Sequence, residues 1–296
     1  MTARIISGKE VSAQIYVELG GRIAAFRERY GVVPHLAVVL VGDDPSSQSY
    51  VRMKSERCRE LGLGSTVVRM DALTPEDELL TALDRLNRDE GVHGVLVQLP
   101  LPGHIRETRV LQAVDPRKDV DCFHPVNVGR MVMGDPDVLL PCTPHGIQQM
   151  LVRSGVRIDG SHVVIVGRSN IVGKPLANIL VQKRPGANAT VTVCHTRTRD
   201  LGAITRGADI LVAAAGSPLA ITADMVGAGA VVVDVGSNRV EDPTAPKGYR
   251  FVGDVDFDAV KEVASAITPV PGGVGPMTVC MLMWNTVEAA WNRLGR

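Results

Sequence analysis

The stretch formed by residues 164–175 constrains the fold of this chain more than any other. It reads Val-Ile-Val-Gly-Arg-Ser-Asn-Ile-Val-Gly-Lys-Pro, an apolar run followed by two glycines with five residues between them. This order predicts a buried strand that continues through a glycine turn into a helix, which is where α/β proteins bind nucleotide phosphates. The spacing is neither the GxGxxG fingerprint nor a P-loop, because Pro175 follows Lys174 where a P-loop has Ser or Thr. A tight turn without any ligand remains the alternative.

Other apolar runs rich in Val and Ile recur along the chain and alternate with amphipathic segments. Runs that are apolar on both faces are typical of parallel strands covered by helices. The alternation therefore predicts a doubly wound α/β architecture. The expected strands are 35–41, 92–98, 162–167, 190–194, 210–215 and 230–235, and the expected helices include 46–61 and a closing helix over 277–294.

The length of 296 residues allows two domains, each with its own core. Turn-forming residues cluster between 133 and 144, which is the best candidate for a domain boundary. A second break falls at 269–276, just before the closing helix. From the residues alone, that helix can pack on either domain.

Charge and cysteine content indicate a cytoplasmic protein whose partner is a small molecule. Lys and Arg number 32 together, as do Asp and Glu, so a nucleic-acid or anionic-membrane role has no electrostatic signature. The five cysteines form no CxxC pair and are typical of reduced thiols. We expect no signal peptide and no membrane span, because no apolar run has the necessary length.

Lys54 is the first candidate for chemistry. On the expected helix 46–61 it lies within a less polar stripe at spacings of three and four. A lysine directed into a partly dry cleft acquires a lowered pKa and can act as a base or proton donor. The alternative is a lysine whose stem follows apolar surface to water. The stripe consists of Tyr50, Met53, Lys54, Cys58 and Leu61.

Two further polar positions follow expected strands. Gln98 ends the strand 92–98, where ligands of open α/β sheets collect, so it can touch substrate or orient Lys54. A glutamine that only bonds a loop backbone is equally compatible with this position. Asp119, Asp121 and His124 lie close together, but three ligands in one short loop are weak support for a metal site. A carboxylate that accepts a substrate's paired N–H donors is the preferred interpretation, and no metal is expected.

The cofactor choice follows from basic residues near the expected nucleotide site. Thr196 and Arg197 follow the strand 190–194, where an NAD-selective site usually has Asp or Glu. Arginine suits the additional phosphate of NADP, and Arg168 lies in the glycine turn. NADP is therefore the expected cofactor, with an exposed basic turn as the alternative.

Five motifs occur in order across nearly the whole chain. They are Ser49-Tyr50-Val51-Arg52-Met53-Lys54, Val97-Gln98-Leu99-Pro100-Leu101-Pro102, Asp119-Val120-Asp121, Gly167-Arg168-Ser169-Asn170-Ile171-Val172-Gly173-Lys174-Pro175 and Pro269-Val270-Pro271-Gly272-Gly273-Val274-Gly275-Pro276-Met277-Thr278. Together they closely resemble the bifunctional methylenetetrahydrofolate dehydrogenase/cyclohydrolase family. The resemblance implies hydride transfer from methylenetetrahydrofolate to NADP, followed by hydrolysis of the methenyl product to formyltetrahydrofolate.

The resemblance also implies the organisation of the protein. A folate-binding catalytic domain would comprise 1–140 and 277–296, and a Rossmann-like NADP-binding domain would comprise 141–276. The final helix would return to the N-terminal domain. A homodimer and a place in one-carbon metabolism, including purine biosynthesis, are further implications.

The resemblance assigns roles to individual residues. Lys54 would transfer the proton in hydrolysis, Gln98 would orient Lys54, Asp121 would bind the pterin, and Tyr50 would stack on it. Other expected substrate contacts are Ser49, Met53, Leu99, Pro100, Pro271, Gly272 and Gly273. Expected cofactor contacts are Gly167, Arg168, Ser169, Ile171, Gly173, Thr196, Arg197, Ala215, Gly216, Gly236, Ser237 and Thr278.

Two residues depart from the family's pattern. Cys122 follows Asp121 where the family commonly has glycine, and Ser237 replaces an apolar residue usual beside the nicotinamide. Neither change removes a catalytic group. The alternatives are a monofunctional dehydrogenase with cyclohydrolase activity lost, a nucleotide-sensing protein without turnover, and a different NADP dehydrogenase that acts on a hydroxy acid.

Overall fold

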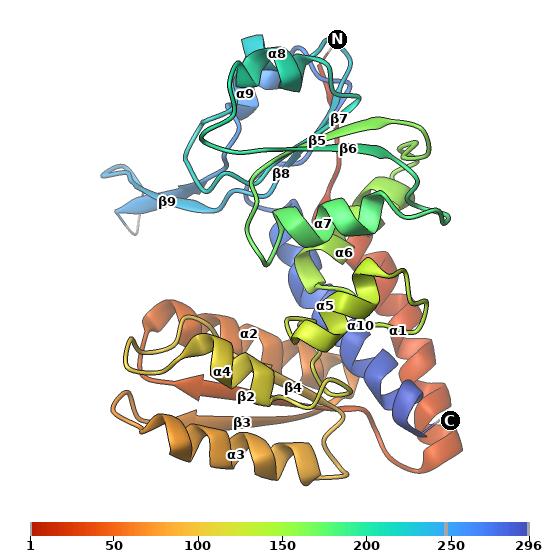
Figure 1. The fold of residues 1–296 in the computed structure, drawn as a ribbon, viewed down its shortest axis with the longest axis vertical. Coiled ribbons are helices and arrows are strands. Elements are labelled where there is room, and N and C mark those ends of the chain that lie inside the picture. Colours follow the sequence, from red (N-terminus) through yellow and green to blue (C-terminus); the bar gives the residue numbers. More distant parts are fainter. Residues whose placement is uncertain (1, 246–247, 295–296) are drawn as a thin grey trace. The chain divides into compact units, whose positions relative to one another are not determined.

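The computed structural model describes residues 2–245 and 248–294, which form two compact units (Figure 1). The first unit contains the described residues of 2–13 and 143–278, and the second contains 14–142 and 279–294. Both units are therefore discontinuous in sequence. Residues 1, 246–247 and 295–296, which fall within the expected domain ranges, lie outside the described residues.

The first unit is built on a six-stranded sheet in which every neighbouring pair is parallel. Strand order reverses between β5 and β7, which makes their carboxyl ends the topological switch point. The order is β1 (Arg4–Ile5), β11 (Ala266–Ile267), β8 (Val231–Asp234), β7 (Ile210–Ala213), β5 (His162–Val166) and β6 (Thr190–Cys194).

Helices cover both faces of this sheet (Figure 1). One face carries alternate strand residues such as Val164, Leu211 and Val232, which pack against the short helices that follow β6, β7 and β10. These are α8 (Leu201–Arg206), η1 (Ala223–Met225) and α9 (Phe257–Val260). The other face is covered by α6 (Cys142–Arg153) and α7 (Gly173–Leu180). An antiparallel hairpin, β9 (Asn238–Glu241) and β10 (Tyr249–Val252), stands beside the sheet. The doubly wound α/β prediction is thereby confirmed.

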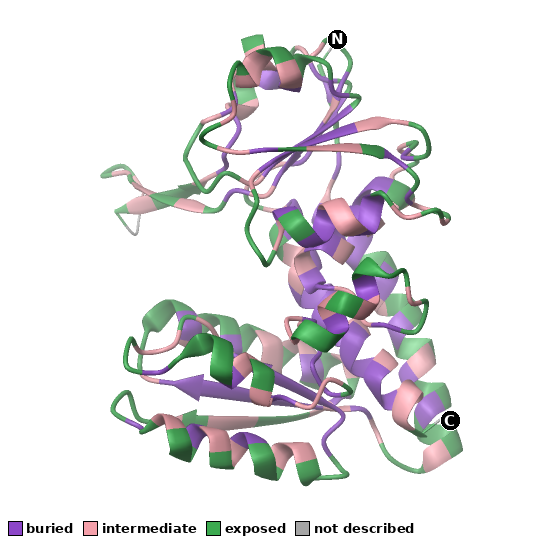
Figure 2. Cartoon of the chain, in the orientation of Figure 1, coloured by how far each residue is buried: buried purple, intermediate pink, exposed green. Residues whose placement is uncertain are grey.

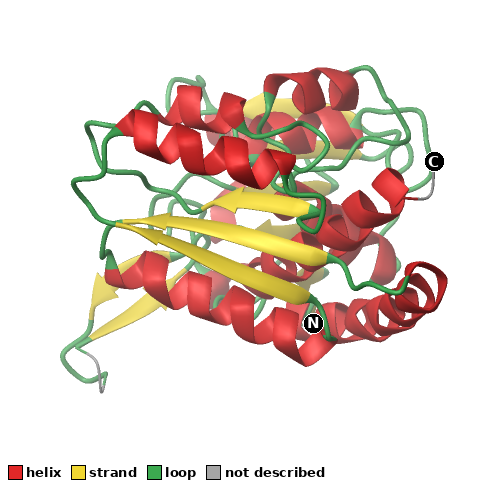
Figure 3. Ribbon diagram, turned by 90° about the horizontal axis from the view of Figure 1, so that it is seen from below, coloured by secondary structure: helices red, strands yellow, loops and turns green. Residues whose placement is uncertain are grey.

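The second unit contains a three-stranded parallel sheet in the order β3 (Gly64–Met70), β2 (His35–Val41) and β4 (Gly94–Val97), with helices on both sides (Figure 3). Helices α3 (Glu76–Arg88) and α4 (Glu107–Ala113) bury their apolar side chains against one face. Helix α2 (Pro45–Leu61) packs on β2 and β3, and α5 (Pro125–Val132) follows the loop after α4.

Two long helices complete the second unit. Helices α1 (Gly8–Tyr30) and α10 (Val274–Leu294) are joined there by an ion pair between Arg22 and Glu288. The rings of Phe26 and Trp291 lie 5.2 Å apart, edge to face. The final helix thus packs on the N-terminal α/β region, as expected. None of the helices within the described ranges combines the length and hydrophobicity that crossing a bilayer requires.

Strands predicted from buried apolar runs occur where expected, with β2 and β6 matching residue for residue. Strand β3 was not predicted; it lies at a sheet edge, and most of its side chains are half-buried or exposed (Figure 2), as are those of the predicted edge strand β6. Residues 2–13 group with the first unit, whereas the expected partition placed them with the second. The reason is strand β1, which pairs with β11.

Candidate functional site

Helix α2 carries the candidate lysine. The Asp44 carboxylate caps the helix by accepting the Ser47 N–H at 2.7 Å, Pro45 occupies its first position, and Gly62 ends it in a left-handed conformation. Tyr50 precedes Lys54 by one turn and is 46% exposed, so its ring is available to a ligand. Ser49 and Met53 are also exposed, whereas Cys58 is buried.

The structure brings Lys54 and Gln98 into contact. Lys54 Nζ donates to Gln98 Oε1 at 2.9 Å. The Gln98 amide nitrogen donates to the Leu99 carbonyl at 2.7 Å, which fixes which end of the amide faces the lysine. Gln98 directly follows β4, and the Leu99–Pro100 peptide that continues the loop is cis. The Gln98 amide therefore orients Lys54 and also forms a hydrogen bond with the loop backbone. The two roles considered for this position, orienting the lysine and bonding a loop, occur together.

Lys54 and Asp121 influence each other's ionisation. Burial lowers the pKa of Lys54 from its usual value, and the nearby Asp121 charge opposes this shift. Burial raises the pKa of Asp121 to about 6, with Lys54 opposing and Asp119 adding to the effect. A neutral lysine is therefore more accessible here than in water, and the Asp121 carboxyl, with its raised pKa, takes up a proton closer to neutral pH than a free carboxyl does.

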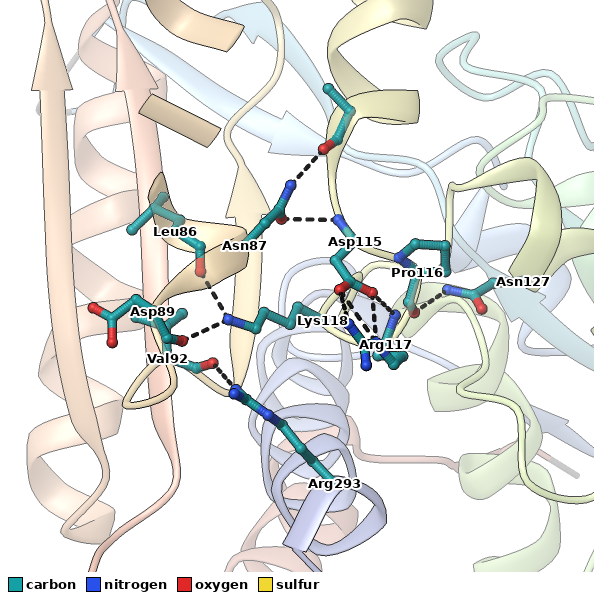
Figure 4. Close-up of polar contacts among 11 residues, drawn as sticks. Leu86, Asn87, Asp89, Val92, Asp115, Pro116, Arg117, Lys118, Asn127 and Arg293 are labelled. Carbon is teal, nitrogen blue, oxygen red and sulfur yellow. Dashed lines mark hydrogen bonds and ion pairs between the residues drawn. The ribbon is translucent and has the colours of Figure 1, made fainter. Parts of the chain in front are cut away.

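The loop that carries Asp121 is anchored by a buried lysine (Figure 4). Lys118 is only 2% exposed, and its Nζ donates to the carbonyls of Leu86 at 2.8 Å and Asp89 at 2.6 Å. These carbonyls lie at the C-terminal end of α3, where a cation is favourable. Lys118 thus ties the loop to the sheet's covering helix three residues before Asp121.

Amide and carboxylate groups hold the rest of this loop. Asp119 accepts the His124 N–H at 2.8 Å and the Asn127 amide at 3.0 Å, so its carboxylate is engaged within the loop. From α10, the buried Asn285 amide donates to the Val120 carbonyl at 2.7 Å. These bonds fix the backbone on both sides of Asp121.

The two cysteines beside Asp121 were not assigned a role from sequence. Cys142 Sγ lies 3.7 Å from Asp121 Oδ1 and donates to it. Cys122 has a φ of 59°, the left-handed region that favours glycine, and its Sγ donates to the Leu139 carbonyl at 2.9 Å. The glycine usual at this position is therefore explained by backbone conformation, and Cys122 keeps the turn.

In the first unit, the glycine turn lies at the switch point. Gly167 follows β5 with a φ of 141°, and a Cβ there would lie 2.1 Å from the Ala214 carbonyl oxygen. Gly173 begins α7, and its Cβ would lie 2.1 Å from the Gly167 oxygen. Only glycine fits these positions, so the turn brings its backbone and the α7 N-terminus to the sheet edge where phosphates bind.

Other expected cofactor residues lie at the same edge of the sheet. Arg168, Ser169 and Ile171 are exposed in the glycine turn, and Ser169 Oγ accepts the Val172 N–H at 3.1 Å. Three more loops follow β6, β7 and β8 at their carboxyl ends. They contain, in order, Thr196 and Arg197, Ala215 and Gly216, and Gly236 and Ser237. Glycine turn, helix N-terminus and exposed arginines together fit a phosphate-bearing dinucleotide.

The remaining expected residues lie at the end of the first unit's chain. Pro271 follows a cis peptide, and Gly272 has a φ of 106°. Gly273 packs so tightly on the start of α1 that a Cβ on Gly8 would lie 1.7 Å from its oxygen. The Thr278 hydroxyl is 2.9 Å from that of Thr143.

Buried Asp234 and Asp254, in the same unit, were not predicted, because neither belongs to a recognisable motif.

Comparisons with known proteins agree with this geometry. Residues 6–121 match the tetrahydrofolate dehydrogenase/cyclohydrolase catalytic domain, and residues 141–294 match the NAD(P)-binding domain of the same family. The bifunctional protein FolD of Dehalococcoides mccartyi strain CBDB1 is 57% identical over 296 residues, covering 100% of this chain and 99% of its own.

Solved structures are similarly close. The bifunctional FolD enzyme of Campylobacter jejuni superimposes with a TM-score of 0.92 at 46% identity, covering 99% of this chain and 100% of its own. The Trypanosoma brucei enzyme, solved with NADP and an inhibitor, gives 0.94 at 39% identity and covers both chains fully. The chain belongs to the tetrahydrofolate dehydrogenase/cyclohydrolase family.

Proposed function

We propose that this protein oxidises methylenetetrahydrofolate with NADP and then hydrolyses the methenyl product to formyltetrahydrofolate. The relatives named above are bifunctional dehydrogenase/cyclohydrolases, and one was solved with NADP. The observation that carries the hydrolytic half is the contact of Lys54 with Gln98, beside the ionisable Asp121. This set is retained, which argues against a dehydrogenase that has lost the second activity.

In the hydrolysis, Lys54 is the catalytic residue. The methenyl group is a cation, and water that adds to it must lose a proton for the ring to open to the formyl product. Because its pKa is lowered, Lys54 can accept that proton and return it to the departing nitrogen. Gln98 keeps Nζ at one position throughout, so the proton is moved over a short path.

In substrate binding, the Asp121 carboxylate accepts the pterin's paired N–H donors with its two oxygens. The exposed ring of Tyr50 stacks on the substrate. The other expected contacts remain proposals: Ser49, Met53, Leu99, Pro100, Pro271, Gly272 and Gly273.

The first unit would hold NADP, which when bound supplies the hydride acceptor for the first reaction. Gly167 and Gly173 bring backbone close to the phosphates, aided by Ser169 and Ile171. Arg168 and Arg197 pair with the additional ribose phosphate. Further proposed contacts are Thr196, Ala215, Gly216, Gly236, Ser237 and Thr278. Hydride transfer needs no protein nucleophile, only alignment of the two rings.

We also infer a homodimer in the cytoplasm that supplies one-carbon units, including those for purine biosynthesis. The balanced charge and the absence of any CxxC pair among the five cysteines of the sequence support an intracellular location. Sedimentation of the purified chain at several concentrations tests the dimer.

The function is tested by mixing purified protein with methylenetetrahydrofolate and either NADP or NAD. Reduced cofactor and methenyl intermediate are followed as separate optical signals. We expect reduction with NADP and little methenyl build-up. Lasting methenyl accumulation would support the monofunctional alternative, and the absence of reduction with either cofactor would contradict the proposed activity.

A further inference from the structure

Two buried aspartates of the first unit have no part in the chemistry proposed above. Asp234 ends β8 and is 2% exposed, and Asp254 follows β10 and is fully buried. Burying a carboxylate is costly unless hydrogen bonds replace the lost water. Their contacts therefore indicate what these residues hold in place.

The Asp254 carboxylate joins two loops that follow different strands. Its Oδ2 accepts the Gly216 N–H at 2.8 Å, and its Oδ1 accepts the Ser217 N–H at 3.1 Å, both from the loop after β7. Oδ1 also accepts the Asn238 side-chain amide at 2.8 Å, from the first residue of β9, which ends the loop after β8. One side chain thus sets the spacing between the loop after β7 and the start of β9, where the loop after β8 ends.

Asp234 holds Asp254 in turn. Its Oδ1 accepts the N–H groups of Gly236 and Asp254, each at 2.9 Å, and its Oδ2 accepts that of Val255 at 3.0 Å. The junction is so tight that a Cβ on Gly236 would lie 2.2 Å from the Asp254 nitrogen. A Cβ on Gly253 would lie 1.7 Å from Asp234 Oδ2. These loops therefore have little freedom to adjust.

All six of these bonds run from an N–H donor to a carboxylate oxygen. Charge-assisted bonds of this kind are about twice as strong as neutral ones, and losing one buried partner is costly. An asparagine in place of Asp254 would keep the shape but present an NH₂ group to at least one N–H donor. The expected result is a displaced loop with the surrounding core intact.

We propose that Asp254, held in place by Asp234, is a positioning residue. It keeps the loops after β7 and β8 in the conformation that binds NADP. The proposal rests on the proposed function, because the proposed cofactor contacts Gly216, Gly236 and Ser237 lie in these two loops. Asp254 touches neither ligand in this scheme. Its effect reaches the reaction only through the cofactor.

The test compares Asp254→Asn with Asp256→Asn, because Asp256 caps α9 two residues away and asparagine caps equally well. For Asp254→Asn we expect the KM for NADP to rise by about tenfold or more, because one to two charge-assisted hydrogen bonds are lost. Hydrolysis of methenyltetrahydrofolate added directly should change less than about twofold. Asp256→Asn should leave both activities unchanged.

An unchanged KM for NADP in folded Asp254→Asn would overturn the proposal, as would a parallel loss of both activities. If Asp254→Asn fails to fold, Asn238→Ala removes one donor from the same carboxylate and should raise the KM about threefold. An unchanged KM in Asn238→Ala would then count against the proposal. If Arg168→Ala raises the KM and Asp254→Asn does not, only this inference fails. If neither variant changes it, the proposed cofactor site itself is wrong.

Discussion

The two candidate sites are built from different parts of the chain. In the second unit, side chains form the site: Lys54 meets Gln98, and Asp121 lies in a loop anchored by Lys118. In the first unit the site is mainly backbone, shaped by glycines that no other residue can replace. Proton transfer needs ionisable groups with shifted pKa values, whereas binding an anion needs N–H groups and close approach.

This difference has a consequence for how each site can fail. A side-chain site loses its chemistry when one group is replaced, while the backbone survives. A backbone site loses its shape when a Cβ is added, while every charged group survives.

Lys54→Met should separate the two activities most strongly. Removing the proton carrier should lower the rate of methenyl hydrolysis by about 10²- to 10⁴-fold, the usual contribution of a general acid–base group. NADP binding should be unchanged, because Lys54 is not in the first unit. Lys183→Met, at an exposed position, is the control. Hydrolysis near the wild-type rate in Lys54→Met would refute the assigned role.

Gly173→Ala should damage the cofactor site instead. The added Cβ would meet the Gly167 oxygen, so the turn must shift, and overpacking of this kind costs about 1–3 kcal/mol. We expect a raised KM for NADP with methenyl hydrolysis retained, measured by steady-state kinetics. Gly20→Ala is the matched control: its Cβ has open space within α1, so it should stabilise the fold by about 0.5–1 kcal/mol.

The pH dependence should distinguish the sites as well. In the proposed binding mode Asp121 must be ionised to accept the pterin's N–H donors, so kcat/KM for methylenetetrahydrofolate should fall as pH drops through about 6. Asp121→Asn should abolish this limb of the profile. Asp121 does not belong to the first unit, so the pH dependence of the KM for NADP should be the same in wild-type and Asp121→Asn protein.

The same raised pKa has the opposite effect on stability. The folded state binds the Asp121 proton more tightly than the unfolded state, whose carboxyl has a pKa near 3.8. Its contribution to stability is therefore complete below that value and is lost as pH rises to about 6. Urea denaturation of wild-type and Asp121→Asn protein across this range should show a difference that grows with pH.

Cys122→Gly should have the smallest effect. Glycine relieves a left-handed conformation that costs about 1–2 kcal/mol, but it adds flexibility to the unfolded chain and removes the Sγ contact with Leu139. These terms nearly cancel, and we expect a change in unfolding free energy below about 1 kcal/mol. Cys122→Val, β-branched at the same φ, should be clearly less stable, which equilibrium denaturation can measure.

Local sequence patterns predicted the architecture and most of the candidate site. Strand β2 was readable because both its faces are apolar and buried. The turn at 164–175 was readable because its glycines lie at close spacing. Lys54 and Gln98 are 44 residues apart, yet each followed from a local signal: a helical stripe and a strand end.

Features that depend on contacts between residues distant in sequence could be found only in the folded chain. Strand β1 is only two residues long and joins the first unit through its pairing with β11, a contact with no local pattern. Lys118 reads as an ordinary surface lysine until the carbonyls at the end of α3 surround it. Asp234 and Asp254 acquire meaning only where three loops meet. Periodicity records which face of an element is buried, but it cannot record which distant N–H or C=O group completes a buried charge.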